Sequence, residues 1–128
     1  MTSHQPARYP TVSAYIMADG ADRVITFATK VLGGEMIMRI PWEDGSLMHG
    51  SLRIGDSVVM ISDASTDFPA FPIWLHGYDP VVDTTYRLAL QNGGTSVQEP
   101  SEQGDGDRRG GVKDPAGNTW WISTHVGA

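Results

Sequence analysis

The stretch GDRRGGVKDPAGNTWWISTH, residues 106–125, determines how the chain ends and shows how its two halves are related. Its centre, DPAG at residues 114–117, predicts a tight reversal, because proline fixes φ and glycine supplies a position with positive φ. The segments on either side of this turn therefore read as two antiparallel strands. Strand alternation places Trp120 and Trp121 on opposite faces of the last strand, so one indole faces the helices and the other faces away.

The order of elements that leads to this hairpin occurs twice. The pairs Gly33-Gly34 and Gly93-Gly94 each follow a segment with helical spacing of apolar residues, and glycine is the residue that most readily ends a helix. The first half predicts a strand, a helix and three strands at residues 11–18, 21–32, 35–40, 47–54 and 57–62. The second half predicts a strand, a helix and a strand at residues 73–78, 81–92 and 95–99, followed by an acidic loop at 100–107 and the closing hairpin. Unless the two glycine pairs coincide by chance, the repeat predicts an α+β fold whose two βαβββ modules build one curved mixed sheet.

The same patterns divide the chain into segments. Residues 1–9 are expected to form a flexible tail, because Pro10 marks the start of the first regular pattern. The first module is expected at 10–63 and the second at 73–125, joined by a linker at 64–72 that is rich in Pro, Ser and Asp. A chain of 128 residues can hold both modules in one compact domain.

Composition narrows the possible partners and compartments. The chain has no cysteine, so disulfides, thiolate chemistry and cysteine-bound zinc are excluded. It has no apolar run long enough for a signal peptide or a membrane span, and we expect a cytoplasmic protein with no membrane partner. The formal net charge is −6 with scattered basic residues, which disfavours nucleic acid as a partner.

Three phrases carry a resemblance to a known family: FATKVLGG at residues 27–34, MHGSLRIGDSVVMIS at 48–62, and the closing stretch at 106–125. Together with the repeated order of elements, they resemble the vicinal oxygen chelate superfamily, which includes glyoxalase I, extradiol dioxygenases and bleomycin-resistance proteins. The phrases are most similar to its PhnB-like branch. The resemblance implies a curved sheet from both modules around a ligand cleft, and a homodimer.

The resemblance also implies where a metal would bind. Metal-dependent members chelate a divalent ion with His, Glu or Gln from the first and last strand of each module. Those positions fall near Ser13, Met60, Trp74 (or Ile73) and Trp121. None is an ordinary ligand for zinc, manganese or iron, which prefer imidazole or carboxylate donors. We therefore expect no metal and no other cofactor.

Alternation within the predicted strands indicates what replaces the metal site. The side chains expected to face the cleft are largely aromatic or sulfur-containing, which is typical of small-molecule pockets. They are Ser13, Tyr15, His49, Met60, Trp74, His76, Tyr78, Trp121 and His125.

Some of these residues also have other possible roles. Trp74 and Trp121 could be ordinary core residues, since large aromatics bury well. His49, His76 and His125 could form a relocated metal site, because three histidines suffice for zinc. A group of Arg53, Arg108 and Asp107 is expected to form an ion pair that supports the hairpin rather than to contact a ligand.

The function that fits best is a metal-independent binding protein that sequesters a small aromatic or cationic compound. Bleomycin-resistance members of the family act in this way, and an antibiotic is one such ligand; the acidic surface favours a cation. The alternative is a metal-dependent lyase, isomerase or dioxygenase with substituted ligands. Whether the protein is an enzyme stays open, although the missing ligand set favours the binding protein, and no catalytic residue is assigned.

Overall fold

The computed structural model describes residues 4–127, which form two modules with the same order of elements. The first module comprises β1 (Ala14–Ala18), α1 (Ala21–Leu32), β2 (Glu35–Pro41), β3 (Leu47–Ile54) and β4 (Ser57–Asp63). The second comprises β5 (Trp74–Tyr78), α2 (Val82–Gln91), β6 (Thr95–Glu102), β7 (Asp107–Lys113) and β8 (Thr119–His125). The predicted α+β fold of two βαβββ modules is confirmed.

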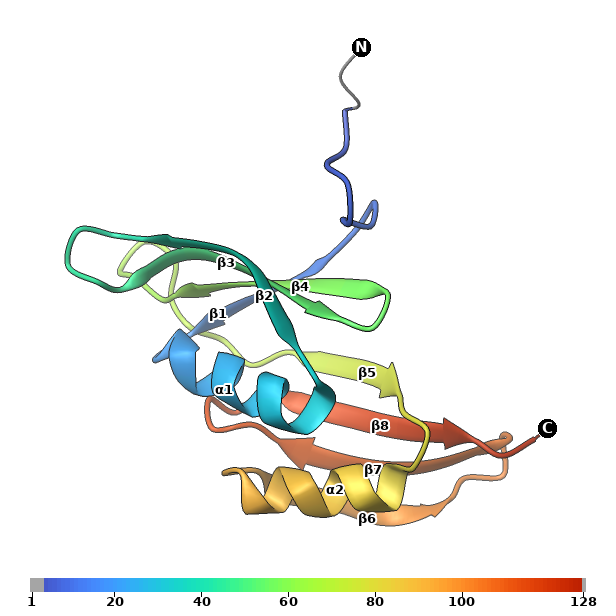
Figure 1. Ribbon diagram of the computed structural model, residues 1–128. Coiled ribbons are helices and arrows are strands. Elements are labelled where there is room, and N and C mark those ends of the chain that lie inside the picture. The colour runs from blue at the N-terminus through green and yellow to red at the C-terminus, as the bar shows by residue number, and fades with distance from the viewer. Residues whose placement is uncertain (1–3, 128) are drawn as a thin grey trace.

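Each module forms its own four-stranded mixed sheet, in the orders β1-β4-β3-β2 and β5-β8-β7-β6 (Figure 1). In both sheets the first strand runs parallel to the last, and the other pairs are antiparallel. One curved sheet from both modules was expected, but within one chain the two sheets are separate. Among the described residues, β1 and β5 therefore each keep one edge that pairs with no other strand.

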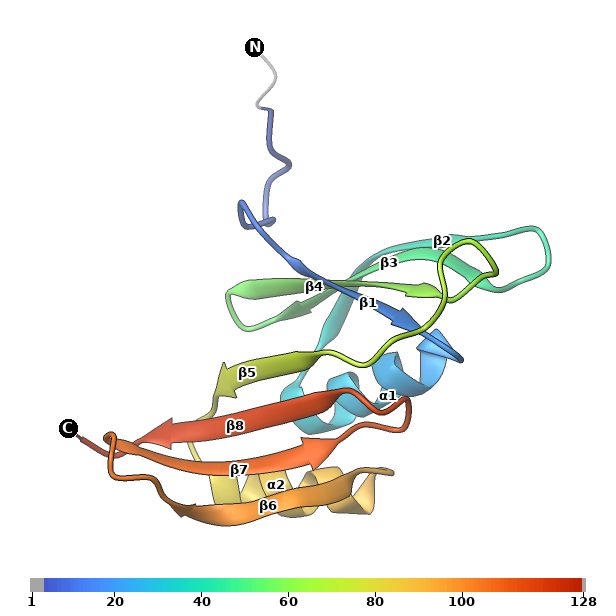
Figure 2. The ribbon, with the colours of Figure 1, turned by 180° about the vertical axis from the view of Figure 1, so that it is seen from behind.

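The two sheets share one hydrophobic core. Ile16 and Phe27 of the first module and Trp120 and Ile122 of the second belong to the same buried cluster. Helix α1 packs under the first sheet, and α2 covers one face of the second (Figure 1). The view from behind shows the opposite face of the second sheet uncovered, with α2 behind it (Figure 2). We call the face of each sheet that points away from its helix the outer face.

The internal repeat extends to the residues that cap the helices. The Asp63 carboxylate at the end of β4 accepts the N–H of Ala21 at the start of α1, at 2.7 Å. At the end of β8, Thr124 Oγ1 accepts the N–H of Val82 at the start of α2, at 2.8 Å. Each module thus uses its last strand to satisfy an N–H group that the first turn of its helix leaves unpaired.

The turn at 114–117 closes the predicted hairpin around one buried carboxylate. Asp114 is 4% exposed and accepts hydrogen bonds from the N–H groups of Ala116 and Asn118, at 2.8 and 3.1 Å. It also accepts from Asn118 Nδ2 at 3.0 Å and from Trp120 Nε1 at 2.8 Å. Gly117 has a φ of 91°, as the turn requires. The turn and the last strand are therefore fixed by the same side chain.

The structure corrects several predicted boundaries. Strand β1 begins at Ala14 rather than residue 11, and Val12 is 83% exposed because it precedes the sheet. Strand β6 continues to Glu102, so its pairing with β7 takes up much of the predicted acidic loop. Residues 1–3 of the predicted tail lie outside the described residues. No helix within residues 4–127 is long and apolar enough to cross a membrane.

Candidate functional site

The nine residues predicted to line one cleft lie on two separate sheets. Ser13 directly precedes β1, and Tyr15, His49 and Met60 belong to the first sheet. The others belong to the second sheet: Trp74, His76, Tyr78, Trp121 and His125. Of the nine predicted residues, those that line the two pockets described below are Trp74, His76, Tyr78 and Trp121, all from the second sheet. The cleft expected from the resemblance is therefore not enclosed by one chain.

The outer face of the second sheet carries a recess of about 320 Å³, which we call the tryptophan recess. Its lining residues are Trp74, His76, Gln98, Gln103, Arg109 and Trp121. The rings of Trp74 and Trp121 meet edge to face with centroids 5.3 Å apart. Trp74 is 75% exposed, so it is not a core residue, and Trp121 is only half-buried.

Gly111 allows the Trp121 ring to lie against the sheet. The two residues are partners in the pairing of β7 with β8. A Cβ atom added to Gly111 would stand 2.7 Å from Cζ3 of Trp121, which is closer than such atoms approach in real structures. The ring therefore lies across β7, and its Nε1 is buried without a hydrogen-bond acceptor among the described residues.

An aspartate at the start of β7 organises the polar part of this face. Asp107 is buried, and its carboxylate accepts from the Tyr78 hydroxyl at 2.9 Å and pairs with His125 Nδ1 at 2.9 Å and Arg109 Nη2 at 3.2 Å. The hydrogen bonds from His125 and Tyr78 lower the pKa of Asp107. The hydrogen bond between Tyr78 and Asp107 raises the pKa of Tyr78. Asp107 is thus held as a carboxylate and Tyr78 as a neutral phenol near neutral pH.

The outer face of the first sheet carries a hydrogen-bond chain whose donors can be assigned by elimination. Ser62 donates its single hydrogen to the Met48 carbonyl at 2.7 Å, so it accepts from the Tyr15 hydroxyl, also at 2.7 Å. Tyr15 must then accept from His49 Nδ1, 3.0 Å away. The other ring nitrogen, Nε2, lies 2.9 Å from the hydroxyl of Ser51, which is fully buried and has no other side-chain hydrogen bond within residues 4–127. Both ring nitrogens of His49 are therefore occupied by hydrogen bonds within this face.

The pairing of the parallel strands shows which residues lie opposite two of the predicted metal positions, Met60 and Trp121. Met60 pairs with Tyr15 rather than with Ser13, and Trp121 pairs with His76 rather than with Trp74. These four positions offer one imidazole and no carboxylate, and His76 Nε2 already lies 2.9 Å from the Ser123 hydroxyl. Such a donor set does not fit a hard divalent ion.

The proposed relocation of the metal site to three histidines also finds no match. His49 lies on a different sheet from His76 and His125. In the part of the chain that the structure describes, no three His, Asp or Glu side chains come together in a way that could hold a metal ion.

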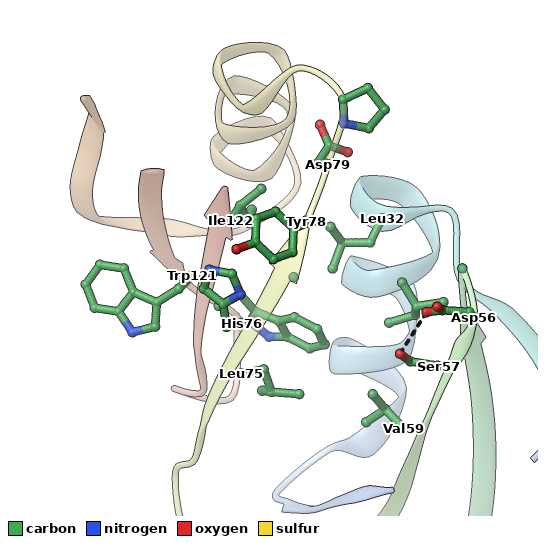
Figure 3. A pocket seen from close by; sticks show the side chains of 15 residues that line it. Leu32, Asp56, Ser57, Val59, Leu75, His76, Tyr78, Asp79, Trp121 and Ile122 are labelled. Atoms are coloured by element: carbon green, nitrogen blue, oxygen red, sulfur yellow. Dashed lines mark hydrogen bonds between the residues drawn. The ribbon is translucent and has the colours of Figure 1, made fainter. Parts of the chain in front are cut away.

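A second, larger pocket lies between the modules. This intermodule groove, of about 520 Å³, runs between β5 on one side and the β3–β4 turn with the end of α1 on the other (Figure 3). Leu32 and Val59 line it from the first module and Leu75 from the second, while Trp121 points away from them on the other side of β5 (Figure 3). Asp79 at its end is engaged by the N–H of Val81 and the hydroxyl of Thr85. The groove is thus mainly apolar and follows the unpaired edge of β5.

The residue that sequence reasoning missed is Arg109. The predicted group of Arg53, Arg108 and Asp107 does not form: Arg108 pairs with Asp83 at 2.7 Å, and Arg53 donates to the Arg8 carbonyl. Arg109 takes the predicted place beside Asp107. Alternation along β7 could have identified it, because Arg109 pairs with Ser123 of the outer face, whereas Arg108 pairs with Thr124, which caps α2.

Comparison with known proteins supports the fold and adds the family. The sequence profile of the Glyoxalase/Bleomycin resistance protein/Dioxygenase superfamily matches residues 11–122. Uncharacterized protein Rv0887c from Mycobacterium tuberculosis is 32% identical over 128 aligned residues, which cover 91% of this chain and 75% of that protein.

Among solved structures, TioX from Micromonospora sp. ML1 superposes with a TM-score of 0.71 at 20% identity, over 90% of this chain and 99% of TioX. A PhnB protein from Bacillus cereus, described as a putative 3-demethylubiquinone-9 3-methyltransferase, superposes with a TM-score of 0.67 at 15% identity, over 90% and 99%. These similarities extend through both modules. The chain therefore belongs to the Glyoxalase/Bleomycin resistance protein/Dioxygenase superfamily.

Proposed function

We propose that the protein binds a small aromatic compound without a metal, with the tryptophan recess as the main contact. The observation that carries this proposal is the pair of tryptophans: Trp74 is 75% exposed and meets Trp121 edge to face over a recess. A single exposed ring is common, but two indole rings in contact beside a recess form a contiguous aromatic surface of the kind that binds ligands. Indole rings bind flat aromatic ligands by stacking and offer little to a metal.

Charge around the recess favours a ligand that is neutral or cationic. Arg109 lies 3.1 Å from Asp105 and 3.2 Å from Asp107, so two carboxylates face one guanidinium. Hydrogen bonds from Arg109 and His125 lower the pKa of Asp105 and of Asp107, respectively, and keep both ionised. A cation over an indole gains a further electrostatic attraction. A planar aromatic cation, such as an antibiotic of that class, suits this site.

We propose that the cleft is completed by a second copy of the chain. At the two ends of β5, the carbonyl of Ile73 and the N–H of Asp79 form hydrogen bonds with β8. Backbone groups along a parallel strand point alternately to its two sides, so the backbone N–H and carbonyl groups of Trp74, His76 and Tyr78 face the unpaired edge. In β1, Ala18 likewise bonds toward the β4 side, which leaves Tyr15 and Met17 on the edge. These two edges occupy equivalent positions in the repeat.

Pairing β1 of one protomer with β5 of its partner would give the backbone groups of both edges hydrogen-bond partners. It would also place the partner's β1 along the intermodule groove. The outer face of the first sheet, with Tyr15 41% and Met38 44% exposed, would then lie opposite the tryptophan recess. The nine predicted cleft residues, which one chain divides between two sheets, would meet across the dimer.

The dimer predicts a solution mass of twice the 13.9 kDa of one chain, as measured by light scattering during gel filtration. Met17→Pro should give monomers, because proline removes an edge N–H without removing one that bonds to β4. Wild-type protein that remains monomeric at high micromolar concentration would contradict this arrangement.

Binding itself can be tested with 10-methylacridinium, a planar aromatic cation. We expect the dye to bind the wild-type protein and quench its tryptophan fluorescence. Calorimetry should show that Trp121→Ala and Trp74→Ala each weaken binding about tenfold or more. Trp42→Phe is the matched control, since Trp42 lies in the β2–β3 loop, and it should bind as the wild type does.

The alternative is a metal-dependent enzyme. Elemental analysis of the same preparation should find well under one zinc, manganese, nickel or iron per chain. A stoichiometric metal, or binding that survives both tryptophan substitutions, would overturn the proposal in favour of the enzyme or of another site.

A further inference from the structure

The tryptophan recess contains hydrogen-bond donors that the protein does not satisfy. Within residues 4–127, the one buried side-chain nitrogen or oxygen atom without a partner is Nε1 of Trp121. A buried N–H without an acceptor is costly, and few native proteins keep one without a reason. An acceptor from outside the chain would remove that cost.

A second donor follows from the hydrogen bonds of Ser123. This serine is fully buried and accepts from Arg109 Nε at 2.9 Å. Its own hydrogen needs an acceptor, and the ring nitrogen His76 Nε2, at 2.9 Å, is the acceptor available to it in the described chain. His76 therefore carries its proton on Nδ1, where it makes no protein hydrogen bond in the part of the chain described.

Arg109 supplies a third donor group. Its Nε bonds to Ser123, and its Nη2 bonds to Asp105 and Asp107. The second terminal nitrogen, Nη1, has no acceptor among the described residues. Trp121, His76 and Arg109 all line the recess. Three side chains that line the recess thus carry N–H groups without an acceptor among the described residues, and that of Trp121 is itself buried.

The charges in the recess decide which kind of acceptor fits. A carboxylate on the ligand would approach Arg109, but it would also approach Asp105 and Asp107, which already neutralise that guanidinium. A carbonyl oxygen accepts the same hydrogen bonds without bringing a third negative charge. The site therefore favours a neutral oxygen.

We propose that the ligand of the tryptophan recess is an aromatic compound that carries a ring carbonyl, whose oxygen accepts a hydrogen bond from Trp121 Nε1. This inference rests on the proposed function and specifies the ligand class. Because Trp121 Nε1 is buried in the free protein, binding requires a neighbouring side chain to move. Trp74 suits this role, since its ring centroid lies 5.3 Å from that of Trp121 and its side chain is 75% exposed, so it can swing aside and stack on the ligand.

Two bicyclic probes of nearly equal size test the proposal. Chromone carries a ring carbonyl and naphthalene does not, and the change in their affinity ratio when the Trp121 N–H is removed isolates the hydrogen bond to the acceptor. We expect the wild-type protein to bind chromone about five- to tenfold more tightly than naphthalene, in line with one net hydrogen bond. Chromone-2-carboxylate should bind more weakly than chromone because of the two aspartates.

The matched substitution is Trp121→Phe, which keeps an aromatic ring and removes the N–H. It should weaken chromone binding about fivefold, leave naphthalene binding nearly unchanged and so abolish the difference between the probes. Trp42→Phe should preserve that difference. Circular dichroism of each variant checks that the fold is intact.

The outcomes separate this inference from the function on which it rests. Equal affinity of chromone and naphthalene for the wild-type protein, or a preference that survives Trp121→Phe, would overturn the carbonyl assignment while leaving aromatic binding in place. Failure of both probes and of 10-methylacridinium to bind would overturn the proposed function and the carbonyl assignment together.

Discussion

Asp114→Ala is expected to destabilise the protein by about 3 kcal/mol. The substitution leaves the N–H groups of Asn118 and Trp120, both buried, without their acceptor. It also removes the side chain that fixes the turn between β7 and β8, and β8 is the strand that carries Trp121. Chemical denaturation with urea, followed by fluorescence, measures the free energy of unfolding.

The repeat provides the control for this substitution. Asp56 lies in the corresponding turn between β3 and β4, but it is exposed, and its side chain accepts one hydrogen bond, from Ser57 at 3.3 Å. Asp56→Ala should change stability by less than about 0.5 kcal/mol. Equal losses for the two alanine variants would show that the buried network around Asp114 contributes less than its geometry indicates.

Gly94→Ala is expected to cost about 2–3 kcal/mol, because there is no room for a side chain after α2. A Cβ at this position would stand 2.7 Å from the backbone oxygen of Ala89 and 3.2 Å from Cε2 of Phe27. The first contact is with backbone that also accepts the N–H of Gly94, at 2.8 Å. Relief therefore requires the end of the helix to move, and thermal unfolding should show a clear decrease in Tm.

Gly34 is the equivalent residue of the first module and gives the comparison. A Cβ there would stand 3.1 Å from side-chain atoms of Leu52, which can adjust by rotation. Gly34→Ala should cost less than about 1 kcal/mol. If Gly94→Ala proves as mild as Gly34→Ala, the crowding at the end of α2 is relieved by a shift of the backbone that this structure does not contain.

The fold could be predicted because its signals are local. The glycine pairs end both helices where expected, and helix α1 and strand β3 have their predicted bounds. Alternation separates Trp120, in the core, from Trp121, on the outer face. The predicted start of β1 was wrong because the alternating pattern already includes Val12, which lies before Ala14, the first residue that pairs with β4.

The site was harder to predict because it depends on contacts between strands. Strand pairing decides that His76, and not Trp74, is the register partner of Trp121, and no pattern within β5 contains that information. The role of Arg109 depends on Ser123 and two aspartates that meet only in the folded sheet. Which of the predicted residues line a cleft depends on how the two sheets are placed, and a single chain leaves them apart.

The two serine-centred hydrogen-bond groups, at Ser62 and at Ser123, show how duplicated halves can specialise. In the first module, Ser62, Tyr15, His49 and Ser51 hydrogen-bond to one another in a chain, which engages their side-chain polar groups within the protein. In the second module, the corresponding group includes an arginine and leaves nitrogen donors open. If the tryptophan recess binds the ligand as we propose, selectivity is concentrated in the second module. Substitutions that change ligand specificity, in evolution or by engineering, should then accumulate in β5, β7 and β8. The first module can vary more freely, because it needs only to provide an apolar, methionine-rich surface.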